Sequence, residues 1–442
     1  MKTIAIIVQK IKFDLILGKY LSNFFSVKYL VPDPKDALLL QINNIPFVKL
    51  FDLPSVEPEE RDFSLALKAI RYPFWPSKAQ KNAPIRVASL REFLLDFIIR
   101  HNIAALITTD KYNYSSLVAF EVAKERRIPI LFTGQGFFRK RSTSASPIPF
   151  RVFDPQIWEK RLCYYQKFPP PGVEKIRISK EYKLNLKRPS IISKLICRFY
   201  YSYNPFFLKR HPDLYPVRSP LKSFFHKRRK NRFKRQTISQ VSIKEPFVLL
   251  PLQGDEICAE IKGFLPIKNM KNLIEIVIQI FTEKKLHQKY NLVIKEHPNR
   301  PFIISDNFVK NLPSWVIFLR KFDMQYLLDF CSFLVTYNSL SGFEAIGRGK
   351  PVICFAPIFY NLSGLVLCPH NMSEFAQMLE LVSNFFPDPK RLNALYDFIW
   401  KFIDLPCSDF SRKSPNIKSL ELIIGRLKWL ISNKYFPPEE LL

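Results

Sequence analysis

The segment from Val335 to Phe355 constrains the fold of this chain more than any other part of the sequence. It reads as an apolar strand, a polar turn, a short helix, a tight turn and a second strand. The chain has only 11 glycines in 442 residues, and three of them lie in this segment, at Gly342, Gly347 and Gly349. The alternation of strand and helix predicts an α/β unit built on parallel strands.

The polar turn of this segment places Ser339 and Ser341 where the helix begins. A helix N-terminus offers unpaired N–H groups and the positive end of a dipole, which suit a phosphate or a carboxylate. Open α/β sheets also bind ligands at the carboxyl ends of their strands. The alternative is an ordinary serine cap, and both interpretations fit this segment taken alone.

The length of 442 residues and a hydrophobic content of 47% predict two folded domains. The 68 Lys and Arg residues against 38 Asp and Glu give a formal net charge of +30. Such a surface attracts polyanions, whether nucleic acid, anionic lipid or acidic glycan.

The seven cysteines form no CxxC pair, which indicates reduced thiols in a cytosolic protein and no zinc site. We expect no signal peptide and no membrane span, because no apolar run is long enough.

The chain divides by pattern into four parts. Residues 1–215 predict an N-terminal Rossmann-like domain, with a strand at Ile103–Thr109 and a helix at Tyr114–Arg127. Residues 216–244 predict a basic linker, 245–410 a second Rossmann-like domain, and 411–442 a C-terminal helix. In this helix we expect Ser414 as the N-cap and a buried face at positions 417, 420, 424, 427 and 431. Residues 141–240 lack clear periodicity and predict irregular segments with short helices.

The basic segment 222–235 interleaves Lys and Arg with aromatic residues. It fits a solvated linker or a patch that binds an anionic membrane surface, where each clustered basic residue gains about 1 kcal/mol. Nucleic acid is the least favoured partner, because no recognisable nucleic-acid-binding module accompanies the segment.

Two further clusters of polar residues follow predicted strands. Lys295, Glu296, His297 and Arg300 come directly after an apolar run, and their basic groups could neutralise a phosphate. The alternative is a polar turn with a surface histidine.

Asp255 and Glu256 follow another strand. They could act as a general base or could cap the next helix. The segment Gly134-Gln135-Gly136 predicts a turn in the first domain. We expect this turn to face a cleft that the polar segments of the second domain line from the other side. No P-loop, complete dinucleotide fingerprint, HExxH or nucleophile elbow is present, and no Asp-x-Asp pair that would hold a metal-bound diphosphate.

These segments together resemble the bacterial capsule polysaccharide proteins that transfer β-Kdo from a CMP-linked donor. The resemblance covers residues 100–134 and 245–361, and four motifs carry it. They are Leu250-Pro251-Leu252-Gln253 with Asp255, Lys295-Glu296-His297-Pro298, Asn338-Ser339-x-x-Gly342-Phe343-Glu344-Ala345 running into Gly349-Lys350-Pro351-Val352, and Phe359-Tyr360.

The resemblance implies a GT-B-like fold, in which two Rossmann-like domains face a cleft and a C-terminal helix packs back on them. It implies that His297 and Ser339 bind the donor phosphate, that Asn338 orients the phosphate loop, and that Glu344 supports the ribose or base. It implies no cofactor besides the nucleotide sugar.

The sequence departs from the family pattern at one position. Where the family has an acidic residue before the second glycine of the first-domain turn, this chain has Gln135. Another carboxylate, Asp255 or Asp110, could take its place, or the chain could have lost activity. We therefore expect a cytoplasmic, peripherally membrane-bound glycosyltransferase acting on a lipid-linked or glycan acceptor. The alternatives are an inactive scaffold with the same fold and a nucleic-acid-binding protein.

Overall fold

A computed structural model describes residues 1–9, 11–50, 53–70, 83–109, 114–138, 142–150, 154–178, 246–255, 257–258, 261–298, 300–407 and 416–442, with residues 186–187, 190, 231 and 243 between them. The chain forms two compact units. The first comprises Met1–Arg151, Cys163–Val217 and Asp397–Leu442, and the second comprises Val152–Leu162 and Arg218–Tyr396. No helix among the described residues is long and apolar enough to cross a membrane.

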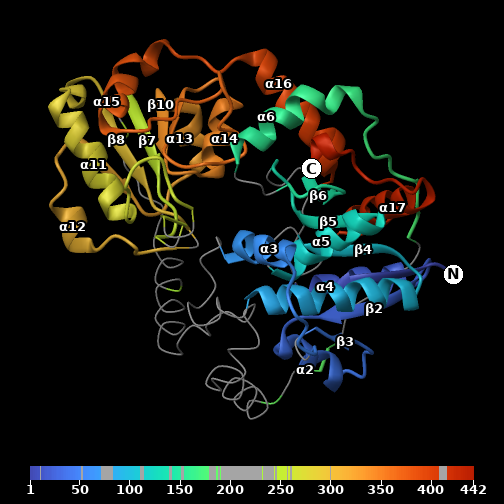
Figure 1. Cartoon of the computed structure of the whole chain (residues 1–442). Coiled ribbons are helices and arrows are strands. Elements are labelled where there is room, and N and C mark those ends of the chain that lie inside the picture. The colour runs from blue at the N-terminus through green and yellow to red at the C-terminus, as the bar shows by residue number, and fades with distance from the viewer. Residues whose placement is uncertain are drawn as a thin grey trace. The chain divides into compact units, whose positions relative to one another are not determined.

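The first unit is built on a sheet of seven strands in the order β12-β6-β5-β4-β1-β2-β3 (Figure 1). Strands β3, β2, β1, β4 and β5 are parallel, whereas β6 pairs antiparallel with β5 and β12 antiparallel with β6. The strands are β1 (Thr3–Ile7), β2 (Ser26–Val31), β3 (Val48–Lys49), β4 (Ile103–Thr109), β5 (Ile130–Gln135), β6 (Ser142–Ser146) and β12 (Asp404–Pro406). The helices wholly in this unit are α1 (Ile11–Leu21), α2 (Pro34–Ile42), α3 (Glu60–Ile70), α4 (Ala83–Arg100), α5 (Tyr114–Arg126) and α17 (Ile417–Ser432).

The core of the first unit joins the two ends of the chain. Leu17 of α1 and Leu427 of α17 are both fully buried in one cluster with residues of β1, β4 and β5. The C-terminal helix α17 begins after Asn416, whose side chain accepts the N–H of Lys418, so Asn416 is the N-cap and the prediction of Ser414 is wrong. Four of its five predicted core positions, Leu420, Ile424, Leu427 and Ile431, are buried, as the spacing predicts, and Ile417 is half-buried.

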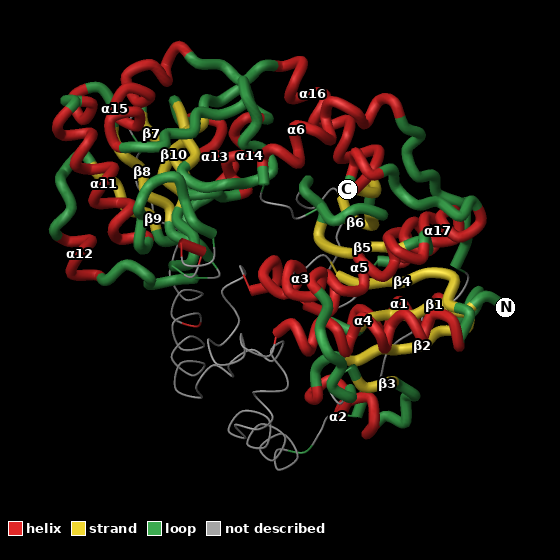
Figure 2. Tube along the Cα trace, in the orientation of Figure 1, coloured by secondary structure: helices red, strands yellow, loops and turns green. Residues whose placement is uncertain are grey.

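The second unit is built on a fully parallel sheet of five strands in the order β11-β10-β7-β8-β9. The strands are β7 (Phe247–Pro251), β8 (Asn291–Lys295), β9 (Val316–Leu319), β10 (Phe333–Thr336) and β11 (Val352–Cys354). Among the described residues its helices include α11 (Met270–Glu283), α12 (Asp306–Lys310), α13 (Met324–Phe330), α14 (Leu340–Ile346) and α15 (Met372–Leu381). Two helices, α6 (Pro155–Tyr164) and α16 (Pro389–Phe398), contain two of the four boundaries between the units, at 162/163 and 396/397. Red helices alternate with yellow strands along this part of the chain in Figure 2, as in a doubly wound α/β fold.

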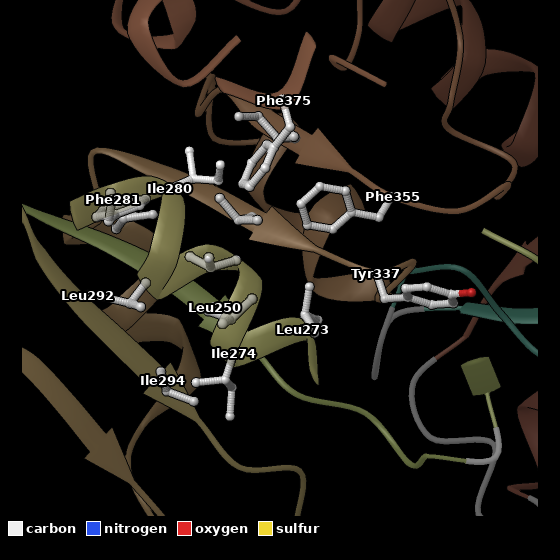
Figure 3. Packing of buried hydrophobic residues seen from close by; sticks show 14 of the residues in the cluster. Leu250, Leu273, Ile274, Ile280, Phe281, Leu292, Ile294, Tyr337, Phe355 and Phe375 are labelled. Atoms are coloured by element: carbon white, nitrogen blue, oxygen red, sulfur yellow. The ribbon is translucent and has the colours of Figure 1, made fainter. Parts of the chain in front are cut away.

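One face of the second sheet is covered by α11 and α15. Ile294 of β8 lies beside Ile274 of α11, and Phe355, which directly follows β11, lies beside Phe375 of α15, with ring centroids 4.8 Å apart (Figure 3). All four side chains are fully buried. Helices α13 and α14 pack on β7, β10 and β11 through residues outside this cluster, as expected for the opposite face. Both units therefore have the α/β, Rossmann-like architecture predicted from the sequence.

The region around residue 141 differs from the sequence prediction. Thr133, Gly134 and Gln135 are the end of strand β5 and pair with residues of β6, so the predicted turn at 134–136 is wrong. Strand β6 also lies inside 141–240, where the sequence predicted irregular segments with short helices, whereas α6 agrees with that prediction. Residues 152–162 belong to the second unit and residues 397–442 to the first, whereas the sequence predicted that domains begin at 216, 245 and 411. The basic segment 222–235 lies outside the described residues except for residue 231.

Candidate functional site

The second sheet has a topological switch point between β7 and β10. The chain leaves β7 toward β8 on one side and leaves β10 toward β11 on the other. Because all five strands are parallel, the loops that follow β7, β8 and β10 lie at the same edge of the sheet. Doubly wound sheets bind ligands at this edge, next to the switch point. Three of the polar segments predicted from the sequence are these three loops.

The loops after β7 and β10 are joined by a hydrogen bond. The backbone N–H of Asn338 donates to Oε1 of Gln253 at 3.2 Å. The side chain of Asn338 is buried, and its Nδ2 lies 3.5 Å from the carbonyl oxygen of Pro357. Asp255 Oδ1 accepts the N–H of Met270 at 2.8 Å, which is the first residue of α11. Asp255 thus caps a helix, one of the two roles that the sequence left open.

Helix α14 begins at the switch point with a serine cap. Ser339 Oγ accepts the N–H of Ser341 at 3.2 Å, and its own N–H donates to Oγ1 of Thr336 at 3.1 Å. Ser339 and Ser341 are both buried, with 7% and 5% of their surface exposed. Leu340 between them is 36% exposed, so solvent reaches this turn. The helix start predicted at Ser339 is confirmed.

Tyr360 fixes the start of α14 from the loop after β11. Its side chain is fully buried, and its hydroxyl donates to the carbonyl oxygen of Ser339. A Cβ atom at Gly342 would lie 2.7 Å from Cζ of Tyr360, so only glycine lets the ring approach the helix this closely. Gly342, predicted to bind the phosphate as part of the motif that starts at Asn338, therefore has a packing role here.

Lys295 ends strand β8 and is almost fully buried. Its Nζ donates to the carbonyl oxygen of Glu296 at 2.6 Å and to that of Arg320 at 3.3 Å. Burial lowers the pKa of Lys295 to about 8, and the Glu296 carboxylate acts in the opposite direction. The ammonium group is therefore a cation that loses its charge within one to two pH units of neutrality.

Glu296 is fully buried and forms an ion pair that the sequence did not reveal. Nη1 of Arg320 lies 3.0 Å from both carboxylate oxygens of Glu296. Arg320 directly follows β9, which is the strand next to β8. No motif in the sequence marks this arginine. Only the register of β8 against β9 could have pointed to this pairing.

The remaining predicted site residues are placed as follows. His297 is half-buried directly after Glu296, and its carbonyl oxygen accepts the N–H of Arg300 at 3.0 Å. Glu344 is half-buried on α14, one turn after the serine cap. Gln135 ends β5 in the first unit, and its side chain lies outside the described residues. Glu256 and Asp110 also lie outside them.

The groups at this edge are of the kinds that can bind an anion. Lys295, His297 and the start of α14 supply a cation, an imidazole and backbone N–H groups on loops of one sheet edge. Within the described ranges, no group of three or more His, Cys, Asp or Glu side chains could hold a metal ion.

The two compact units with Rossmann-like sheets place the protein in the α/β class. Residues 179–376, less than half of the chain, match a family model described as capsule polysaccharide biosynthesis protein. Over this part the chain is similar to capsule polysaccharide biosynthesis proteins, as the resemblance of residues 245–361 predicted, whereas residues 100–134 lie outside the match. The matched range includes the loops after β7, β8 and β10.

The comparisons with individual proteins give more distant similarities. Protein FixF of Sinorhizobium fredii is 26% identical over 174 residues, which span 39% of this chain and 41% of that protein. The chain thus matches less than half the length of this relative.

Among solved structures, the KpsC beta Kdo 2,7 transferase of Thermosulfurimonas dismutans is 15% identical, with a TM-score of 0.35 over 76% of this chain and 90% of that chain. The UDP-GlcNAc 2-epimerase of Methanocaldococcus jannaschii is 12% identical, with a TM-score of 0.32 over 97% and 100%. Likeness at this level does not extend to substrate or activity.

Proposed function

We propose that this chain is a glycosyltransferase of capsule or surface polysaccharide synthesis that uses a nucleotide-activated sugar, with CMP-Kdo as the first donor to test. The meeting of three loops at the switch point of the second sheet carries the proposal. The hydrogen bond between Gln253 and Asn338 joins two of these loops, and Lys295 and His297 come from the third. The match of residues 179–376 to capsule polysaccharide biosynthesis proteins supports the same conclusion.

In the proposed reaction the donor phosphate lies at the start of α14. The N–H groups near Ser339 and Ser341, together with Lys295 and His297, stabilise the negative charge that develops on the leaving nucleotide. The acceptor hydroxyl gives its proton to a carboxylate and attacks the anomeric carbon of the sugar, while the bond from that carbon to the nucleotide phosphate breaks. Asp255 and Glu256 are the candidate bases in this unit, and Glu344 would support the ribose or base.

An inactive binding protein with the same fold is the second candidate, and Gln135 favours it. An amide at this position is neither a base nor a nucleophile. In this case the protein would bind a nucleotide sugar or a glycan without turnover.

We further propose that the protein works at the cytoplasmic face of a membrane, with the basic segment 222–235 on anionic lipid and a lipid-linked or glycan acceptor.

The test is thermal unfolding of the purified full chain with CMP, CMP-Kdo, UDP, GDP and ADP. A ligand at 100 times its dissociation constant adds about 2.7 kcal/mol to the free energy of unfolding. A selective shift with CMP and CMP-Kdo supports the proposed donor, and a selective shift with another nucleotide replaces it. If a well-folded sample shows no shift with any of the five, the proposal of a nucleotide-sugar transferase is refuted.

A further inference from the structure

Arg320 contacts both ends of the loop that connects β8 to α12, here called the β8–α12 loop (residues 296–305, described except for residue 299). At the start of the loop, its Nη1 lies 3.0 Å from each carboxylate oxygen of Glu296. At the other end, its Nη2 donates to the carbonyl oxygen of Ile304 at 3.3 Å and to the carboxylate of Asp306. One guanidinium group thus links the two ends of the loop, and these contacts of Arg320 are here called the clamp.

The middle of the loop also packs against Arg320. The guanidinium carbon lies 4.5 Å from the ring centroid of Phe302 and 5.2 Å from that of Phe318 on β9. Phe302 has a φ angle of 59°, in the left-handed region that residues with a bulky side chain seldom adopt. Such a conformation persists only where the surroundings hold it, and such residues concentrate at ligand-binding and catalytic sites.

The central ion pair of this arrangement is shielded from solvent. The side chain of Arg320 is 12% exposed and that of Glu296 is fully buried. Lys295 adds a second tie between the same strands, because its Nζ donates to the carbonyl oxygens of Glu296 and Arg320. The planar guanidinium group donates from two nitrogens to different partners and stacks on two rings at the same time, which a lysine at the same place cannot do.

We propose that Arg320 is a positioning residue for the anion site: it fixes the β8–α12 loop so that His297 stands ready for the donor phosphate before the substrate binds. Because His297 directly follows Glu296, the ion pair that holds Glu296 in place also restricts the position of His297. Arg320 itself touches no substrate. The role of His297 rests on the proposed function, whereas the clamp is measurable without any ligand.

The variants are Arg320→Lys and the double variant Glu296→Gln/Arg320→Met. The double variant removes both buried charges, so it leaves no unpaired carboxylate in the interior; Asp306, which also loses Arg320, is 54% exposed. The matched control is Arg348→Lys. Arg348 also contacts a carboxylate, that of Asp329, and a carbonyl oxygen, but it follows the last turn of α14, at the edge of the sheet opposite the switch point.

Hydrogen exchange of the peptide 296–306, compared with the peptide 333–347, tests the clamp. We expect exchange at Phe302–Ser305 to rise about tenfold or more in both Arg320 variants, with 333–347 unchanged, because the loop opens locally. Exchange rates equal to those of Arg348→Lys would overturn the clamp.

Calorimetric titration with CMP tests the positioning role. We expect CMP affinity to fall about 10- to 100-fold in Arg320→Lys, because small displacements of a binding group are costly. The thermal midpoint should stay within the range of the Arg348→Lys control, since a purely structural role would move the midpoint and not the affinity. Wild-type affinity in both Arg320 variants would overturn the inference. If the wild-type chain binds no nucleotide, the proposed function fails, and the exchange measurement alone decides whether Arg320 clamps the loop.

Discussion

Replacement of Gly342 by alanine is the sharpest test of how the candidate site is built. A Cβ atom at this position would lie 2.7 Å from Cζ of Tyr360 and 3.1 Å from Cε2, and closer still to the hydroxyl oxygen. Tyr360 is fully buried and cannot swing into solvent. The substitution must therefore displace either the ring or the first turn of α14, where Ser339 accepts the hydrogen bond from Tyr360.

The magnitude follows from three terms. Overpacking of a close-packed site costs about 1–3 kcal/mol. Loss of the hydrogen bond from a buried hydroxyl costs about 1–3 kcal/mol more. Alanine in place of glycine in a helix returns about 1 kcal/mol. We therefore expect Gly342→Ala to lower the free energy of unfolding by about 3 kcal/mol, which for a unit of this size is a fall of about 6–12 °C in the melting midpoint.

The assay is calorimetric unfolding of Gly342→Ala, Tyr360→Phe and the double variant. Tyr360→Phe removes the atom nearest to the new methyl group and should cost about 1 kcal/mol alone. The double variant should lose about 1 kcal/mol less unfolding free energy than the sum of the two single variants, because the steric conflict is partly relieved. Strict additivity, or a Gly342→Ala variant as stable as the wild type, would refute the packing argument.

Two more predictions concern titration and catalysis. Because burial lowers the pKa of Lys295 to about 8, below its unfolded value, the unfolded chain binds more protons above pH 8, and stability gains from this group as the pH rises toward 10.5. The difference in unfolding free energy between wild type and Lys295→Met should change over this window, and a pH-independent difference would contradict the shift. Asp255→Asn keeps an oxygen to accept the N–H of Met270 but removes the base, so it should retain nucleotide binding and lose turnover if Asp255 is catalytic. Wild-type turnover in this variant would move the role to another carboxylate.

Much of the second unit could be predicted because its signals are local. The strand, turn and helix around Ser339 follow from an apolar run, a capping residue and closely spaced glycines, which depend only on neighbours in the sequence. The polar residues after β7, β8 and β10 meet at one sheet edge because the strands are parallel, and this also follows from the strand–helix alternation. The α/β class was therefore accessible without coordinates.

The parts that the sequence missed depend on contacts between distant residues. Arg320 lies 24 residues after Glu296 and carries no motif, so its role appears only once β8 and β9 are paired. Tyr360 belonged to the resemblance, but nothing in the sequence shows that it packs on Gly342. Strand β6, with the sequence Ser-Thr-Ser-Ala-Ser, lacks the hydrophobic residues that mark a strand.

The segment at Gly134–Gly136 shows how a site motif can have a structural cause. A Cβ atom at Gly136 would lie 2.7 Å from Oδ2 of Asp404, which also accepts the N–H of Phe137 at 2.8 Å across 267 residues of sequence. Oδ1 of the same carboxylate accepts the hydroxyl of Ser144 on β6 at 2.7 Å, while burial raises the pKa of Asp404. The second glycine of the motif is thus required by a buried carboxylate from the C-terminal part of the chain, whichever residue stands at 135. The glycines alone therefore do not argue for catalysis at this place, and activity depends on another carboxylate, such as Asp255 or Asp110.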